Sequence, residues 1–313
     1  MRRLSVQIEC AVQVCGSGTK FKYADQVRKF YTQIMYTNFA RKRSAKSTHA
    51  NRAAKSSNQA KQLASIGKSG TQVKYASKHT NQTRKIKETI KGVFTMKIEM
   101  WSDYVCPFSY MGKRHLDIAL EELNLTEDVD IDFKSYQLNP DIPGYSGESM
   151  KELLSKKQDV PQDQVEKNLR EVQLKAEKAE LYYNFEIMKP TNTLDAHRLT
   201  KYATTIGKHR VLAEKIFNSY FEKGGLISDH DKLLELAAES GISKSDANKV
   251  LTNPDAYKDE VLKDMARAEE LNVESVPYFL IDKEHVIPGS ESVETFIMAL
   301  QQIRKGSSET TKK

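Results

Sequence analysis

The order of strand-like and helix-like patterns after residue 95 restricts the folds open to this chain more than any other feature. Residues 96–101, "MKIEMW", and residues 129–138, "VDIDFKSYQL", alternate apolar and polar side chains, which is typical of half-buried strands. Between them, apolar residues recur with helical spacing at Leu116, Ala119, Leu120 and Leu123. The chain therefore runs from a strand into a helix and back into a strand.

A helical middle and a second set of strands follow. Residues 145–258 are rich in good helix formers, and one predicted helix spans residues 161–181 with a proline at its start. Residues 276–282, "VPYFLID", and 284–289, "EHVIPG", predict two short strands. A terminal helix over residues 292–305, with a serine as its N-cap, ends the pattern.

This order predicts an α/β fold, namely a thioredoxin-like sheet with an inserted all-helical subdomain. A two-domain chain is the alternative, but each half would then hold too few strands for a sheet of its own. The predicted parts are the thioredoxin-like domain over 96–144 and 259–306, the helical insertion over 145–258, and a polar tail over 307–313.

Composition separates a basic leader from this domain. Residues 1–95 carry 20 Lys and Arg against three Asp and Glu, a net charge of +17, whereas residues 96–313 carry 29 against 39, a net charge of −10. The leader is poor in large apolar residues, so its composition predicts a disordered segment that cannot bury enough surface to fold.

Three interpretations of the leader stay open. Its charge suits a nucleic-acid-binding arm, although its most basic part has few aromatic residues. It is also basic, Ser-rich and poor in acids, like an organelle transit peptide. We favour a third, in which translation starts at Met96, because residues 91–93 can be encoded by a sequence that resembles a bacterial ribosome-binding site.

Cysteine content and hydropathy bear on the compartment. The chain has no run of 18 or more apolar residues, and its first 30 residues lack the pattern of a secretory signal, so we expect no association with a membrane. Three cysteines, Cys10, Cys15 and Cys106, imply no disulfide framework. We therefore expect a cytoplasmic protein, or an organelle protein if the leader is a transit peptide.

Cys106 carries the main chemical hypothesis. It lies in "CPFS", residues 106–109, at the junction between the first strand and the first helix. Unpaired N–H groups and the positive end of the helix favour a thiolate there, and the thiolate is the nucleophilic form. Pro107 suits the first turn, and the Ser109 hydroxyl can turn back toward the sulfur, although it cannot resolve a mixed disulfide. The alternative is an unreactive cysteine packed against the sheet.

A second motif lies far along the chain. Pro277 directly precedes an apolar strand. A trans proline that simply starts an edge strand is one interpretation, and a cis X–Pro bond in a thioredoxin-like fold is the other. With a cis bond, the Val276 backbone would face the sulfur and pair with an extended substrate. The hypothesis requires that the sulfur be reachable from solvent and lie close to residue 277.

The segments "MKIEMWSDYVCPFSYMGKR", "NTLDAHRLTKYA" and "VPYFLID" resemble, in this order and spacing, the DsbA-like thioredoxin family and especially its FrnE-type branch. The resemblance covers most of residues 96–305. It implies a nucleophilic Cys106, a facing cis-proline at Pro277, and a site shaped by Pro107 and Phe108. Ser109 stands where dithiol members carry the second cysteine, which argues against two-cysteine cycling.

Related branches are similar in using a serine near this helix start together with glutathione. These are the kappa-class glutathione transferases and the 2-hydroxychromene-2-carboxylate isomerases, which carry Ser where this chain has Cys106. His197 falls in a family-like segment and is a candidate substrate-binding residue, or else a histidine packed between the insertion and the sheet. The seven histidines show no ligand spacing, so we expect no metal site.

These observations predict a thiol–disulfide oxidoreductase that uses a single cysteine. Its partners would be a protein disulfide or a small thiol, with no tightly bound cofactor and with glutathione or another low-molecular-weight thiol as cosubstrate. A glutathione-dependent transferase or isomerase is the second hypothesis, and a redox-silent binding module is the third.

Overall fold

The computed structural model describes residues 96–310, and side chains to residue 305. The predictions made for the basic leader, including Cys10 and Cys15, therefore lie outside the described residues. The terminal helix, α12 (Val293–Thr310), extends well into the predicted polar tail, because residues 306–310 contain no proline to interrupt its backbone hydrogen bonds. Ser292 accepts a hydrogen bond from the backbone N–H of Thr295, as expected of its N-cap.

The sheet has four strands in the order β2-β1-β3-β4. The strands are β1 (Met96–Ser102), β2 (Val129–Ser135), β3 (Tyr278–Ile281) and β4 (His285–Pro288). The strand β1 pairs in parallel with β2 and antiparallel with β3, which pairs antiparallel with β4. The central strand β1 therefore joins the two ends of the chain's folded part, and its Ile98, Met100 and Trp101 are fully buried.

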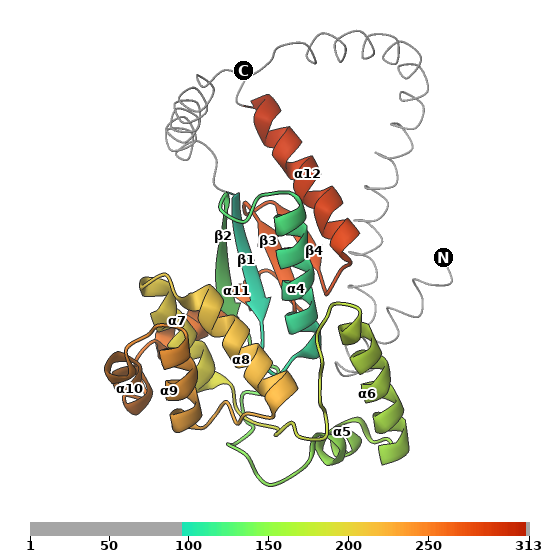
Figure 1. Ribbon diagram of the computed structural model, residues 1–313, viewed down its shortest axis with the longest axis vertical. Helices are drawn as coiled ribbons and strands as arrows, with labels where there is room; N and C mark the ends of the chain where they lie inside the picture. The colour runs from blue at the N-terminus through green and yellow to red at the C-terminus, as the bar shows by residue number, and fades with distance from the viewer. Residues whose placement is uncertain (1–95, 311–313) are drawn as a thin grey trace, which may run out of the picture. The chain divides into compact units, whose positions relative to one another are not determined.

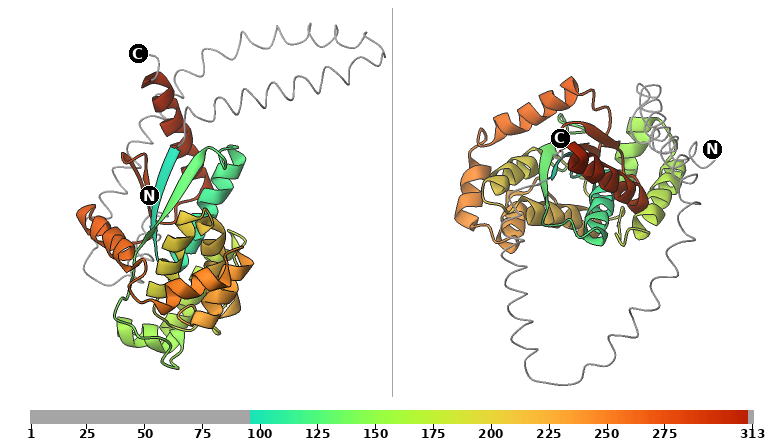
Figure 2. Two further views of the ribbon diagram at one scale, coloured as in Figure 1. Left: turned by 90° about the vertical axis from the view of Figure 1, so that its left-hand side faces the viewer. Right: turned by 90° about the horizontal axis from the view of Figure 1, so that it is seen from above.

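Helices cover both faces of the sheet. The helix α4 (Pro107–Glu122) follows β1 and packs against α12 on one face. The helix α11 (Lys258–Glu270) packs against β2 on the other face, as the two views of Figure 2 show. This layered arrangement confirms the predicted thioredoxin-like fold.

The helices between β2 and α11 form the predicted insertion. They are α5 (Met150–Gln158), α6 (Gln162–Glu177), α7 (Leu194–Thr205), α8 (His209–Lys223), α9 (His230–Glu239) and α10 (Lys244–Thr252). Figure 1 shows them gathered beyond the end of β1 that leads into α4, with α7 to α10 on one side and α5 and α6 on the other. The insertion therefore lies next to the turn that carries Cys106.

One predicted helix ends early. The pattern over residues 161–181 predicted a single helix, but α6 ends at Glu177 and Glu180 adopts a positive φ of 59°. A residue with φ in this range cannot continue a right-handed helix. The chain then leaves the helix axis and crosses toward α4, which brings Tyr183 next to the turn of Cys106.

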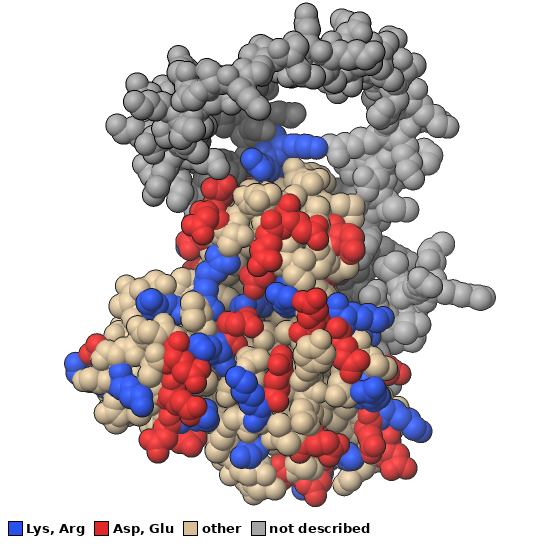
Figure 3. Space-filling view, in the orientation of Figure 1, with Lys and Arg blue, Asp and Glu red and all other residues tan. Residues whose placement is uncertain are grey.

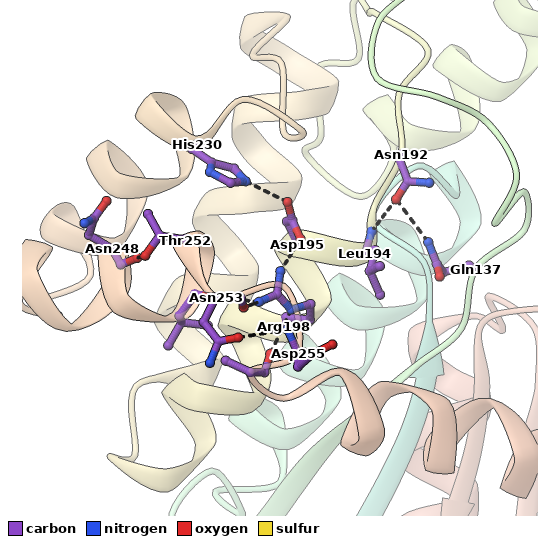
Figure 4. Close-up of polar contacts among 12 residues, drawn as sticks. Gln137, Asn192, Leu194, Asp195, Arg198, His230, Asn248, Thr252, Asn253 and Asp255 are labelled. Atoms are coloured by element: carbon purple, nitrogen blue, oxygen red, sulfur yellow. Dashed lines mark hydrogen bonds and ion pairs between the residues drawn. The ribbon is translucent and has the colours of Figure 1, made fainter.

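A buried arginine fixes α7 within the insertion. Arg198 is 2% exposed and donates hydrogen bonds to the carbonyls of Val250 and Asn253 at the end of α10. It also pairs with Asp195, whose other oxygen lies 2.7 Å from Nε2 of His230 (Figure 4). These contacts join α7, α9 and α10, so the position of His197 on α7 is set by the whole bundle.

In the part of the chain that the structure describes, every helix is too short or too polar to cross a bilayer. Lys and Arg side chains are interspersed with Asp and Glu over the face of the molecule that Figure 3 shows.

Candidate active site

Cys106 is the N-cap residue of α4. Its backbone is extended, with φ −89° and ψ 112°, and Pro107 is the first helical residue. The Cys106 carbonyl accepts hydrogen bonds from the N–H groups of Ser109 at 3.0 Å and Tyr110 at 3.4 Å. The cysteine therefore occupies the end of the helix where unpaired N–H groups and the positive end of the dipole favour negative charge.

The loop before β3 lies next to Cys106. The Val276–Pro277 peptide bond is cis. The Cys106 thiol donates a hydrogen bond to the carbonyl oxygen of Val276, with Sγ and O 3.4 Å apart. The Pro277 carbonyl in turn accepts a hydrogen bond from the N–H of Gly289, at 2.8 Å. The structure thus brings together two motifs that lie 170 residues apart in sequence.

Gly112 permits this close approach. A Cβ atom placed on Gly112 would lie 2.7 Å from Cγ of Pro277 and 3.3 Å from Cζ of Phe279. A contact of 2.7 Å is too short for two carbon atoms, so any larger residue would push the proline away from α4. Gly112 was not among the predicted site residues, although a glycine inside a helical pattern is itself a signal for tight packing.

Burial of the site departs from the expectation. Cys106 is only 2% exposed and belongs to an apolar cluster with Trp101, Val276 and Tyr278. Phe108, which is partly exposed, packs against this cluster. The requirement that the sulfur lie near residue 277 is met, but the requirement that it be open to solvent is not. A substrate can reach the sulfur only if part of this apolar cover moves.

Ser109 lies on the buried side of the first turn. It is fully buried, and its Oγ accepts a hydrogen bond from the backbone N–H of Asp103 at 3.4 Å. A hydroxyl that accepts one bond still has its own proton to donate. Ser109 therefore holds the loop before Cys106 and keeps a donor for a second partner.

Asp103 and His197 form a buried pair beneath this loop. Asp103 is 1% exposed, and its carboxylate accepts a hydrogen bond from the N–H of Leu138 at 2.8 Å. Its other oxygen lies 3.4 Å from Nε2 of His197, whose ring packs on Tyr104 with centroids 4.9 Å apart. His197 thus contacts residues two and three positions before Cys106, from the insertion side. Asp103, three residues before Cys106 in the sequence, is therefore a buried acid and not a solvated one.

Tyr183 is a further residue at the site that was not among the predicted site residues. Its side chain is 1% exposed, and its hydroxyl donates a hydrogen bond to the carbonyl oxygen of Pro107 at 2.7 Å. Its neighbour Tyr182 is 67% exposed. Two adjacent tyrosines in a sequence do not reveal which one faces a site, so only the fold separates them.

The family comparison agrees with this geometry. Residues 97–301 match the DsbA-like thioredoxin domain, which covers the sheet, α4 and the whole insertion. The chain belongs to the DsbA-like thioredoxin family. In this DsbA-like chain the fold brings together the turn of Cys106, between β1 and α4, and the loop of Pro277, before β3.

Two relatives are similar over nearly their whole length. YwbO of Bacillus subtilis (strain 168) is 28% identical over 215 residues, which are 67% of this chain and 98% of that protein. A crystal structure described as "probable DsbA oxidoreductase SCO1869" from Streptomyces coelicolor is 29% identical, with a TM-score of 0.61 over 66% of this chain and 89% of that one. A 2-hydroxychromene-2-carboxylate isomerase, 14% identical with a TM-score of 0.51 over 68% of this chain and 98% of its own, shares the fold.

A charged groove flanks α4 of this DsbA-like chain on the side that faces α8. A cavity of about 600 Å³ lies between α4 and α8. Lys113 is 8% exposed at its side chain and pairs with Asp117 and Glu214, and Tyr110 donates a hydrogen bond to Glu214 at 2.7 Å. Burial lowers the pKa of Lys113, but its two carboxylate partners more than offset this and hold that pKa above its ordinary value. The flank therefore carries a protonated lysine.

Metal ligands do not cluster in the part of the chain that the structure describes, where no group of three or more His, Cys, Asp or Glu side chains could hold a metal ion.

Proposed function

We propose that this DsbA-like chain is a thiol–disulfide oxidoreductase of the FrnE-type branch that reacts through Cys106 alone and an external thiol. The observation that carries this proposal is the position of the Cys106 sulfur, at the N-cap of α4 and 3.4 Å from the carbonyl oxygen of Val276 beside cis-Pro277. A thiolate gains stability at the first position, and an extended substrate has a backbone to pair with at the second.

The exchange balances in two steps. The Cys106 thiolate attacks one sulfur of a disulfide, so that a mixed disulfide with Cys106 forms and the other half leaves as a thiolate. An external thiolate, for which glutathione is the probe, then attacks the substrate sulfur of that mixed disulfide and releases the Cys106 thiolate. The external thiol releases the mixed disulfide, a step that Ser109 cannot perform because it has no sulfur. Ser109 instead stabilises the thiolate with its hydroxyl, while Pro107 and Phe108 shape the turn.

His197 acts in this scheme through Asp103 rather than on the substrate. Its Nε2 lies 3.4 Å from the buried Asp103 carboxylate, and the backbone of Asp103 bonds to both Cys106 and Ser109. The imidazole packs against this carboxylate without a hydrogen bond between them, so its loss would open a space beneath the loop, which is costly. We therefore assign His197 the role of holding the loop, in place of the substrate contact expected from the sequence.

Capture of a mixed disulfide tests the function. The full chain is incubated with oxidised glutathione, and peptide mapping locates the adduct, since Cys10 and Cys15 can also react. We expect one glutathione on Cys106, its removal by reduced glutathione, and no adduct at this position in Cys106→Ala. An absence of adduct on Cys106 in the native protein, together with conjugation of glutathione to an aromatic electrophile, would instead support a transferase.

The pH dependence of alkylation tests the state of the sulfur. We expect iodoacetamide to modify Cys106 with an apparent pKa below the roughly 8.5 of free cysteine. In Ser109→Ala the apparent pKa should rise, because a donor to the thiolate is lost. A profile at or above the free-cysteine value in the native protein would favour a binding module without redox chemistry.

A further inference from the structure

Tyr183 reaches the reactive turn from the insertion. It lies in the segment between α6 and α7, and its hydroxyl donates to the carbonyl of Pro107, the first residue of α4. Within an α-helix this carbonyl already faces the N–H of the residue four positions ahead, here Met111. The bond from Tyr183 is therefore an addition to the helix, and the helix does not depend on it.

The phenol ring is held on several sides. It stacks on Phe221, with centroids 4.6 Å apart, and lies edge-on to Phe185 at 5.9 Å. The side chain of Gln173 donates to the Tyr183 carbonyl at 2.7 Å, and the N–H of Asn184 donates to the carbonyl of Phe221 at 2.8 Å. The oxygen of Tyr183 is consequently fixed in place, whereas its hydrogen can still turn about the C–O bond.

The electrostatic surroundings keep this hydroxyl protonated. Burial, followed by the negative charge of the Cys106 thiolate, raises the pKa of Tyr183 well above its ordinary value. Tyr110 on α4 and Glu222 and Glu214 on α8 raise that pKa further. Tyr183 therefore keeps its proton where a cysteine titrates, and its 2.7 Å bond to the Pro107 carbonyl places its oxygen at the residue next to Cys106.

We propose that the Tyr183 hydroxyl is the donor with which the insertion stabilises the Cys106 thiolate, turning from the Pro107 carbonyl toward the sulfur when the thiol loses its proton. This role rests on the proposed function, because it concerns the same thiolate. It gives the insertion a direct effect on the reactive sulfur that the sheet and α4 alone do not supply.

The test is a titration of Cys106 in the full chain. The Cβ chemical shift of ¹³C-labelled cysteine reports the pKa of the thiol without requiring any reaction or access for a reagent. We expect Tyr183→Phe to raise the apparent pKa of Cys106 by about one unit, that is about a tenfold smaller thiolate fraction below the midpoint, as for the loss of one hydrogen bond to a charged group.

Two matched controls separate the hydroxyl from the ring. Tyr110→Phe removes a hydroxyl from the same aromatic stack, but that hydroxyl faces Glu214. Tyr182→Phe removes the neighbouring, exposed hydroxyl. Both should leave the Cys106 titration unchanged. An unchanged or lowered apparent pKa in Tyr183→Phe, or an equal shift in Tyr110→Phe, would overturn the role of Tyr183.

A second variant covers the case in which Tyr183→Phe does not fold. Fluorotyrosine at position 183 keeps the shape of the side chain and makes its hydroxyl a stronger donor, so the apparent pKa of Cys106 should fall, and no fall would overturn the role. Failure of the native chain to take up glutathione would count against the proposed function alone, since the difference between the Tyr183 variants and the native chain is measured independently.

Discussion

The two flanks of α4 are held by different forces, although neighbouring residues carry them. Gly112 faces the sheet, where the space between α4 and Pro277 leaves no room for a methyl group. Lys113, one residue later, faces α8 and pairs there with Glu214 and with Asp117 one turn along α4. Close packing therefore holds α4 on the side of the sheet, and ion pairs hold it on the side of the insertion. Only the second kind of contact should respond to pH, and the cysteine turn depends on both.

The largest effect should come from filling the sheet side. In Gly112→Ala the new methyl group must displace Pro277, and overpacking of this kind costs about 1–3 kcal/mol, against about 1 kcal/mol gained from the helix propensity of Ala. We expect a net loss of up to about 2 kcal/mol in the free energy of unfolding by urea, and a weaker Cys106 reaction, because the Val276 carbonyl moves with the proline.

Gly144→Ala is the matched control for this substitution. A Cβ atom there would meet only Oγ of Ser228, at 3.8 Å, which is ordinary van der Waals contact. Equal stability losses at Gly112 and Gly144 would show that the contact with Pro277 is not what requires a glycine in α4.

A smaller effect should follow when the charged flank is broken. Glu214→Gln leaves the buried Lys113 with Asp117 as its remaining carboxylate partner, and we expect a loss of about 1 kcal/mol at neutral pH, less than for a fully buried pair because Glu214 is 45% exposed. Glu180→Gln, which removes an exposed partner of Arg114, should cost less than about 0.5 kcal/mol.

The loss in Glu214→Gln should depend on pH. Burial raises the pKa of Glu214, but Lys113, together with a hydrogen bond from Tyr110, more than offsets this, so its pKa lies below the ordinary value of 4.5. A lowered carboxyl pKa stabilises the folded state above the unfolded value, and this contribution disappears as the pH falls through the folded value. Native and variant stabilities should therefore converge below about pH 4.5 in urea unfolding, and a constant difference would contradict the assignment.

Apart from the control at Glu180, the smallest effect should come from the hydroxyl of Tyr110. Tyr110→Phe removes one partly buried hydrogen bond to Glu214 and keeps the ring stacked on Phe217, with centroids 5.0 Å apart. We expect a loss of about 0.5–1 kcal/mol, measured by urea unfolding. A loss as large as that of Gly112→Ala would show that the two flanks are not separable.

The sequence predicted the elements better than their contacts. The strands at 96–101 and 276–282 were close to the observed β1 and β3, because period-two patterns and a proline at a strand start are local signals. Ser292 as an N-cap was equally local. The early end of α6 was missed, because its helix-forming composition continues beyond Glu177 and only the positive φ of Glu180 ends it.

The site was predictable only in part. The family motifs pointed to Cys106 and Pro277, which the fold brings together. The burial of Asp103 and of Lys113 was not predictable, because a charged residue is normally solvated unless partners from other elements are supplied by the fold. The contact of Tyr183 with the cysteine turn could not be predicted for the same reason, because its partner, Pro107, lies 76 residues away in the sequence.

Two stretches of backbone, after β2 and before α11, connect the insertion to the sheet domain, and two of its side chains, Tyr183 and His197, reach the loop and turn around Cys106. Through the role that we propose for Tyr183, an exchange of this block of helices would therefore retune the thiol. Chimeras that carry the insertion of one DsbA-like protein on the sheet of another should inherit their sulfur chemistry largely from the donor of the helices.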